Sequence, residues 1–441
     1  MNRFIESKKE SLGDFFRFIG RWLKAKAVDF WRGLRRLSHN CALLFLPALL
    51  VASLILGVVC VFRINAISRI QYDQQAASFW SGSSSNVYSQ LTCVARWQAV
   101  SDGGPSLPLD SVRSLTVREI DKIHASLEEA VLASENARSD REERRELEGG
   151  SEEPRAWIDA YSSELLLGVT RPKSDLLAEM TTEARITAVG GDYSLIHRMH
   201  MLSGSFFTEI SYGTRPVVLD EGLAFSLFSS SDIVGNEIKI NGRTFTVSGV
   251  VRKNPGKEME ASYGQFPRAY IAFPDVVGLS QGGPIPSPEE NAGPRGSSEG
   301  KGSSDADGYA VMYYEVVLPD HLSGIARQFL RNAFEANGKT LDKDFLVIEN
   351  TGRFQLARLW DQTFPLGLSR HAASEYTLSY YELAANIAQE RIFFWWIVFF
   401  FSVFSALSGG VGTYCRFAKK RALQRKEKRR AEEDFDIREL R

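Results

Sequence analysis

Two charge-free hydrophobic runs, one near each end of the chain, constrain its fold more than any other feature. Residues 41–62 form a run of 22 residues without a charge, and residues 392–415 form a run of 24. Each is long enough to cross a hydrocarbon core of about 30 Å as a helix. The 441-residue chain is therefore predicted to be a membrane protein with a large domain between two transmembrane helices.

The distribution of charge predicts the orientation of these helices. Residues 1–40 carry 10 Lys and Arg against 4 Asp and Glu, and residues 416–441 carry 11 against 6, although the net charge is only −1. Positively charged flanks of short membrane segments stay in the cytoplasm. The sequence predicts a multi-pass protein of the cell (plasma or inner) membrane with both termini cytoplasmic. Attraction to anionic lipid explains the basic segments, so nucleic acid is not expected as a partner.

These patterns predict five regions along the chain. Their boundaries are a basic amphipathic helix at residues 1–40, a first transmembrane helix at 41–63, an extracytoplasmic domain at 64–391, a second transmembrane helix at 392–415 and a basic cytoplasmic tail at 416–441. The first region suits the membrane surface, because Phe, Trp and Leu recur at helical spacing among basic residues; a soluble packing helix is the alternative. Two interpretations of the tail remain open: a helix that continues the second span and transmits motion to a partner, or only a topology anchor.

A hairpin is the clearest local signal within the central domain. Glu237–Ile240 and Arg243–Val247 alternate polar and apolar residues around Asn241-Gly242, the dipeptide preferred in two-residue turns. Such a turn places Ile238 opposite Phe245. The side chains that then share the face to be buried are Ile238, Ile240, Phe245 and Val247.

The region around this hairpin resembles the extracytoplasmic core domain of MacB-type ATP-binding-cassette (ABC) permeases, which are also called FtsX-like or mechanotransmitting transporters. The resemblance lies in the order of short motifs: Leu202–Thr208, Pro216–Leu219, Gly222–Phe228, Val234-Gly235, Ile238–Asn241 and Phe245–Val251. Ser205 stands where the family usually has Arg. The similarity extends weakly to Ile186–Tyr193, Ala269–Pro274 and Tyr314–Leu318.

The resemblance implies an α+β fold, a MacB-like α/β domain enclosed by two membrane helices. It also implies a permease-like subunit that couples a separate cytoplasmic ABC ATPase to a conformational change outside the membrane, with a companion permease or a second copy as partner. The family usually has third and fourth membrane helices, which this sequence does not show. A split permease and a derivative that kept the domain but lost transport both remain open. The second alternative is a bitopic cell-envelope scaffold, sensor or binding protein.

Glycines in the second predicted transmembrane helix indicate where a partner helix could bind. Gly409, Gly410 and Gly412 would let another helix approach closely, and a companion permease is predicted to dock beside them.

Other elements are predicted from local patterns. Val117–Leu147 is expected to be a helix, because Thr116 and Glu119 have the spacing of a capping box. Residues 280–306 contain 6 Gly, 4 Pro and 6 Ser and are expected to form a disordered surface loop. Strands are expected at Tyr270–Phe273, Val311–Leu318 and Phe345–Ile348, and helices at Leu322–Asn337 and within Phe354–Arg391.

No pattern in the sequence predicts catalysis, so the protein is not expected to be an enzyme. Gly296–Lys301 imitates a phosphate-binding loop, but its glycines are one residue too close and no strand precedes it. His197 and His200 could face the same way on a helical turn, yet no third metal ligand is spaced nearby. Ser203, Ser205 and Ser229–Ser231 lack a nucleophile elbow. We therefore predict no catalytic, cofactor-binding or metal-binding residue and no cofactor.

Four cysteines are too few for a disulfide framework. Cys41, Cys60 and Cys415 lie in or beside the hydrophobic runs, which leaves Cys93 alone in the central domain. An impermeant thiol reagent is expected to label Cys93 if its side chain is exposed.

Overall fold

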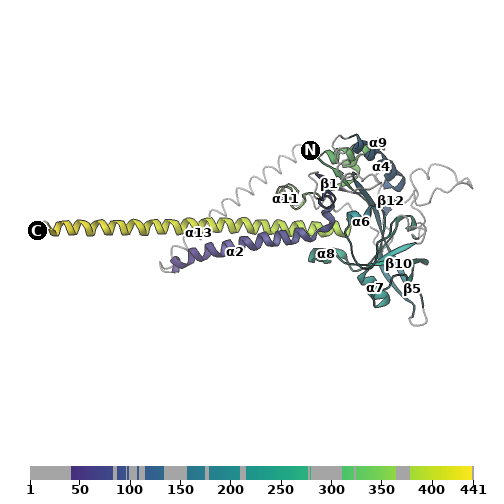
Figure 1. Cartoon of the computed structure of the whole chain (residues 1–441), viewed down its shortest axis with the longest axis horizontal. Coiled ribbons are helices and arrows are strands. Elements are labelled where there is room, and N and C mark those ends of the chain that lie inside the picture. Colours follow the sequence, from purple (N-terminus) through teal and green to yellow (C-terminus); the bar gives the residue numbers. More distant parts are fainter. Residues whose placement is uncertain are drawn as a thin grey trace, which may run out of the picture. The chain divides into compact units, whose positions relative to one another are not determined.

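The computed structural model divides into two compact units, and each is described separately (Figure 1). The structure describes residues 41–82, 87–95, 97–98, 107–108, 115–133, 156–173, 178–208, 215–276, 279, 310–321, 324–363 and 378–439. One unit holds Ala66–Phe393, and the other holds residues up to Asn65 together with Phe394–Arg441. The predicted helix at 1–40 and loop at 280–306 lie outside the described residues.

The two charge-free runs lie within long helices. Helix α2 spans Cys41–Ile70 and helix α13 spans Tyr380–Glu439. Among the described residues, these two helices are long and apolar enough to cross a membrane, over Phe45–Ile70 and Tyr380–Arg430. Helix α13 continues without a break through the basic tail.

Inside the smaller unit, the glycines of α13 face α2. A Cβ atom at Gly409 would lie 3.4 Å from the carbonyl oxygen of Leu46, and one at Gly412 would lie 3.2 Å from the Leu46 methyl groups. Two turns further along α2, the Ser53 hydroxyl donates to the Ser405 hydroxyl at 3.0 Å. Small residues thus permit a close helix pair. The helix that approaches is α2 of the same chain, which corrects the prediction that a companion permease docks beside the glycines.

The larger unit is built on a ten-stranded sheet with the order β14-β1-β13-β5-β6-β11-β8-β10-β7, with β9 off this path. The strands of this sheet are β1 (Tyr88–Val94), β5 (Ile158–Arg171), β6 (Met180–Gly191), β7 (His200–Gly204), β8 (Pro216–Asp220), β9 (Glu237–Ile240), β10 (Arg243–Arg252), β11 (Arg268–Ala272), β13 (Tyr313–Pro319) and β14 (Leu346–Glu349). Two-stranded pairs form between β4 (Leu115–Thr116) and β12 (Ala310–Val311), and between β2 (Trp97–Gln98) and β3 (Leu107–Pro108). Parallel pairing occurs between β8 and β10 and between β6 and β11.

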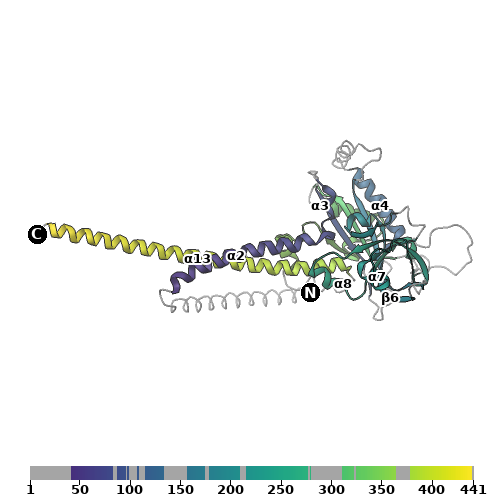
Figure 2. The same ribbon diagram turned by 60° about the horizontal axis from the view of Figure 1, so that its bottom comes forward.

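Strand β9 closes part of this sheet into a ring. It pairs with β10 on one side and with β5 on the other, where Ile240 lies opposite Val169. Strands β5, β6, β11, β8, β10 and β9 therefore follow one another around a closed circuit, visible as a ring of strands in Figure 2. Closure satisfies the backbone groups that an open sheet edge would expose.

The predicted hairpin is present with the predicted register. Phe245 pairs with Ile238 and Arg243 with Ile240. Asn241 has φ 45° and Gly242 has φ 84°, the left-handed backbone that this turn requires. The Ile238, Ile240, Phe245 and Val247 side chains are all buried.

The larger unit also contains short helices. They are α3 (Ala76–Ser81), α4 (Val117–Leu132), α6 (Tyr193–Ile196), α7 (Glu221–Phe228), α8 (Lys257–Tyr263), α9 (Ile325–Ala336), α10 (Leu341–Asp344) and α11 (Leu356–Thr363), with 3-10 turns η1 (Tyr72–Gln74) and η4 (Phe273–Val276). One core contains Leu91 and Val316 together with the apolar faces of α4 and α9. A second core contains Val317, the neighbour of Val316, and lies with α3 and α6. The alternation along β13 thus supplies two cores, one on each face.

Most local predictions are confirmed within about three residues. The capping box is present, since the Thr116 hydroxyl accepts from the Glu119 amide and the Glu119 carboxylate accepts from the Thr116 amide. Helix α4 then runs to Leu132, and the rest of the predicted helix up to Leu147 lies outside the described residues. The α+β class, with a mixed sheet between two apolar helices, is confirmed.

Candidate functional site

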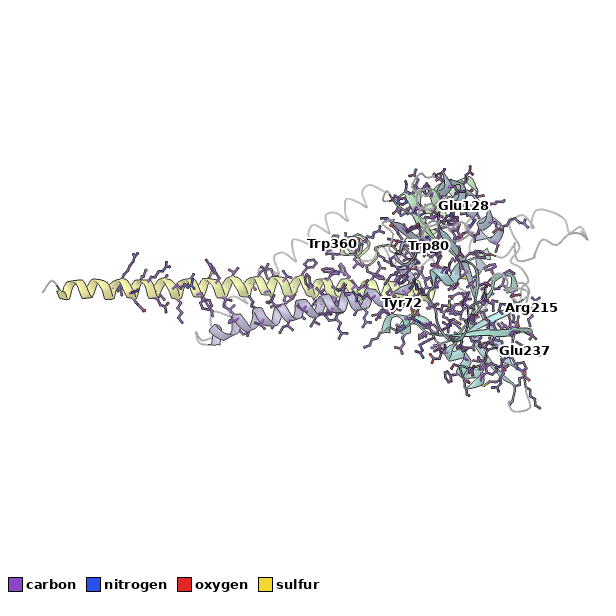
Figure 3. All side chains as sticks on the ribbon, in the orientation of Figure 1. Tyr72, Trp80, Glu128, Arg215, Glu237 and Trp360 are labelled. Atoms are coloured by element: carbon purple, nitrogen blue, oxygen red, sulfur yellow. The ribbon has the colours of Figure 1, made fainter. Side chains whose placement is uncertain are left out.

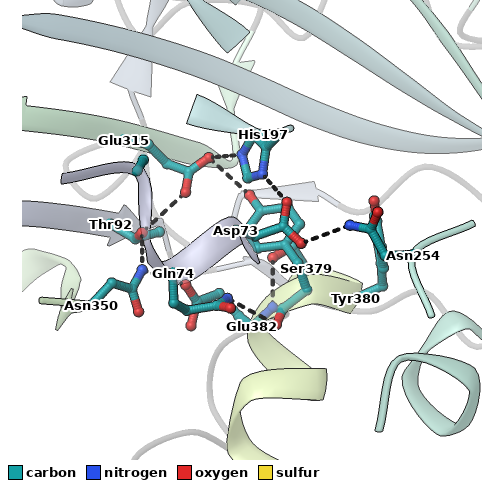
Figure 4. Close-up of polar contacts among 12 residues, drawn as sticks. Asp73, Gln74, Thr92, His197, Asn254, Glu315, Asn350, Ser379, Tyr380 and Glu382 are labelled. Carbon is teal, nitrogen blue, oxygen red and sulfur yellow. Dashed lines mark hydrogen bonds and ion pairs between the residues drawn. The ribbon is translucent and has the colours of Figure 1, made fainter. Parts of the chain in front are cut away.

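Several segments that are distant in sequence meet at one buried polar cluster on the α3 and α6 side of the sheet (Figure 4). They are the turn directly after α2, the strands β1 and β13, the residue after α6, the residues after β14 and the first turns of α13. We call this cluster the junction network, and its members are Asp73, Thr92, His197, Glu315, Asn350, Arg353, Tyr381 and Glu382. All eight are buried.

His197 is the centre of the junction network. Its Nδ1 lies 3.0 Å from Oδ1 of Asp73, and its Nε2 lies 2.5 Å from Oε2 of Glu315. Burial alone would lower the pKa of His197, but the charge of Glu315 and the hydrogen bonds that the ring donates to both carboxylates outweigh burial and raise the pKa to about 10. At neutral pH the ring therefore carries a proton on each nitrogen and donates to both carboxylates.

Glu315 also receives a hydrogen bond from α13. Tyr381, the second residue of that helix, donates its hydroxyl to Oε2 of Glu315 at 3.2 Å, and the Thr92 hydroxyl on β1 donates to Oε1 at 3.1 Å. A buried carboxylate is stable as an anion only when such donors surround it. One side chain of β13 thus binds groups from β1, α6 and α13.

Glu382 provides the second connection between α13 and the sheet. The Asn350 amide donates to Oε1 of Glu382 at 2.8 Å and to the Thr92 hydroxyl at 3.0 Å. Arg353 forms an ion pair with Glu382 and donates to the Gln389 side chain at 3.0 Å. The guanidinium therefore holds two turns of α13 at once.

A layer of aromatic side chains continues the attachment. The Tyr380 hydroxyl lies 3.1 Å from the hydroxyl of Tyr270 on β11. The guanidinium carbon of Arg268 lies 4.0 Å from the centroid of the Tyr380 ring, and Arg268 is also paired with Glu164 at 2.9 Å. Further along, Arg391 forms an ion pair with Glu258 of α8. The first turns of α13 are therefore bound to the domain by ionic, hydrogen-bonded and aromatic contacts.

The comparisons with known proteins agree with this architecture. The family model of the MacB-like periplasmic core domain matches residues 48–283, which is more than half of the chain. The chain belongs to this family. It is a membrane protein with a MacB-like extracytoplasmic α/β domain.

Two solved structures are similar to the MacB-like domain, and no curated protein matches the chain in sequence. The periplasmic region of MacB from Actinobacillus actinomycetemcomitans is 16% identical, with a TM-score of 0.34, over 61% of this chain and 92% of that one. The extracellular domain of the noncanonic ABC-type transporter YknZ from Gram-positive bacteria is 10% identical, with a TM-score of 0.32, over 58% of this chain and 99% of that one.

In the MacB-like domain the two histidines named in the sequence do not act as a pair. His197 follows α6 and is buried, whereas His200 begins β7, is exposed and packs edge-on against Tyr72. Both ring nitrogens of His197 are occupied by hydrogen bonds to carboxylates. Within the described part of the chain, no group of three or more His, Cys, Asp and Glu side chains could hold a metal ion.

The other side chains considered in the sequence have structural surroundings. The Ser203 hydroxyl donates to the carbonyl oxygen of Ser231 at 2.6 Å, which joins β7 to the segment after α7. Cys93 points into the core from β1 with 0% exposure, and burial raises the pKa of its thiol. An impermeant reagent therefore cannot reach Cys93 in the folded protein. The Gly296–Lys301 segment lies outside the described residues.

Sequence reasoning missed the junction network, although weak signals for it exist. Glu315 interrupts an otherwise apolar strand, and Asp73 follows closely after a membrane helix. A charge in either place needs a buried partner or solvent. The sequence does not say which partner, because Asp73, His197 and Glu315 are separated by more than a hundred residues each.

Proposed function

We propose that this chain is a membrane subunit that couples a separate cytoplasmic ABC ATPase to a conformational change of its extracytoplasmic domain. Membership in the MacB-like family supports the ABC transporter context. The junction network is the observation that carries the proposal, because it attaches the end of one membrane helix and the start of the other to the same strands.

The energetics of the junction network favour a movement in which α13 carries the sheet with it over one in which α13 slides past the sheet. Its charges are buried and satisfied, so moving α13 away from the sheet would leave Glu315 or Glu382 with missing partners. Removing one partner from a buried ion pair typically costs about 3–5 kcal/mol. A shift of α13 therefore moves β13 and β1 with it rather than breaking the contacts.

The predicted boundaries and orientation form part of the proposal. We place residues 41–63 and 392–415 in the membrane, residues 64–391 outside and both termini in the cytoplasm. The compact unit Ala66–Phe393 supports the domain boundaries, and the basic ends support the orientation. The bilayer and a companion permease or second copy are the further partners, with the companion contacting a face of α13 other than its glycines.

Orientation can be tested with engineered thiols, because Cys93 is buried. In full-length protein with its native cysteines replaced by Ala, Phe225→Cys places a thiol on the exposed face of α7, and Lys428→Cys places one in the basic tail. In intact cells an impermeant maleimide should label the first variant only, and lysis should expose the second. Labelling of Lys428→Cys in intact cells would overturn the orientation.

Coupling can be tested after purification in detergent. Full-length tagged protein should co-purify with an ATPase, and spin labels in the domain should report a distance change when ATP replaces ADP. Glu382→Gln should reduce this change while the ATPase still co-purifies. Recovery of an oligomer without an ATPase, under conditions that keep related transporters intact, would instead favour the cell-envelope scaffold.

A further inference from the structure

Helix α11 contacts the domain through two neighbouring side chains and exposes an aromatic one. Leu359 is fully buried in the domain, and the guanidinium of Arg358 donates to Oε1 of Glu349 on β14 at 2.6 Å. The next residue, Trp360, has 52% of its surface exposed. Its position is labelled in Figure 3. The anchored neighbours fix the direction in which Trp360 projects.

Trp360 lies beside the point where α13 becomes purely apolar. Its ring centroid is 6.5 Å from that of Phe393. Phe393 is the second residue of the charge-free run, which follows directly after Arg391. A helix that changes from charged to charge-free residues at this place passes from water into hydrocarbon here. With residues 392–415 in the membrane, as proposed above, Trp360 lies at the depth of the lipid headgroups.

The chemistry of tryptophan fits this depth better than it fits water. The indole combines a large apolar surface with one N–H donor, and such rings concentrate at membrane–water interfaces. The ion pair between Arg391 and Glu258 lies at the same level, on the side of α13 that contacts α8. Charged groups and an exposed tryptophan around one helix match the composition of an interface.

We propose that α11 is a membrane-interface anchor, in which Trp360 inserts into the headgroup layer of the outer leaflet beside α13. The anchor would hold this edge of the domain at the bilayer surface. It is separate from the junction network and does not depend on ATP coupling.

Spin labelling of the full-length protein tests the anchor. All four native cysteines are replaced by Ala, and the protein is reconstituted in liposomes of phosphatidylcholine and phosphatidylglycerol. A nitroxide is placed at Trp360→Cys, or at Ala357→Cys, which is exposed one turn earlier and leaves Trp360 in place. Phe225→Cys is the matched control, because Phe225 is 48% exposed on a helix that, like α11, has eight residues.

The collision rates of the label with oxygen and with a water-soluble nickel chelate give its depth. At positions 360 and 357 oxygen should relax the label more than nickel does, and at position 225 the order should reverse. Adding Trp360→Ala to Ala357→Cys should move that label toward the aqueous value. If the nickel chelate collides with the label at position 360 as often as with the label at position 225, the proposal that α11 is an anchor is wrong. A label that neither reagent reaches would also overturn it, because a protein surface would then cover α11.

Discussion

The Tyr381 hydroxyl donates to Oε2 of Glu315, the same oxygen that accepts from His197. Because His197 also donates to Asp73, three hydrogen bonds connect the turn after α2 to the second residue of α13. The connection passes through a single carboxylate on β13. Displacement of either helix end is therefore expected to act on the strand that lies between them.

Tyr381→Phe isolates the contribution of this hydroxyl. The substitution keeps the buried ring but removes one donor from a buried carboxylate, so we expect a loss of about 1–3 kcal/mol in the free energy of unfolding. Denaturation of the full-length protein in detergent measures it. Tyr72→Phe is the control, because Tyr72 is only partly buried and contacts His200 through its ring. Equal stability of wild type and Tyr381→Phe would show that the bond contributes nothing.

The protonation of His197 predicts how stability depends on pH. Its folded pKa of about 10 lies above the ordinary value of 6.5. A raised pKa means that the stabilisation is fully present below pH 6.5 and is lost as pH rises through 10. The melting temperature should therefore decrease as the pH rises from 7 to 10. In His197→Gln this decrease should be smaller.

A neighbouring histidine provides the control for the pH profile. His200→Gln changes an exposed ring three residues away, so the fall between pH 7 and pH 10 should persist. A profile that stays steep in His197→Gln would assign the dependence to another group.

The sequence predicted the parts of the fold that depend on local patterns. Asn241-Gly242 determines a two-residue turn, and that turn determines the pairing of Ile238 with Phe245. The ring closure by β9 was not predictable in the same way. It depends on the contact of Ile240 with Val169, and neither residue carries a local signal for the other.

The same distinction applies to the site. Glu315 and His197 are ordinary residues in their own segments, and only the sheet brings them together. The glycines of α13 show the opposite case, because their spacing correctly predicted a close helix. Composition could not tell whether that helix came from α2 or from another chain, because small residues permit any membrane helix to approach closely.

Phe245→Ala tests the register of the hairpin and the packing of Phe245 in the core. Phe245 is 1% exposed, so truncation should cost about 3–5 kcal/mol as a cavity in a packed core. Lys239→Ala, on the exposed face of the same hairpin, should cost little. Thermal unfolding of the full-length protein in detergent compares the two variants. Equal shifts would contradict the observed register.

The ion pair between Arg353 and Glu382 gives the sharpest test of how α13 is held. Its side chains are 3% and 1% exposed, whereas those of Arg331 and Asp342, 2.7 Å apart, are 44% and 39% exposed. Removing one member of a buried pair costs about 3–5 kcal/mol, and an exposed pair is worth about 0–1 kcal/mol.

Glu382→Gln and Asp342→Asn therefore make a matched comparison of isosteric neutral variants. Glu382→Gln should lower the free energy of unfolding by several times more than Asp342→Asn. It should also increase amide hydrogen exchange in the first turns of α13, because Arg353 then loses its charged partner on that helix. Asp342→Asn should leave exchange in α13 unchanged. If exchange in α13 rises equally in both variants, global destabilisation explains the effect and the junction network does not hold the helix.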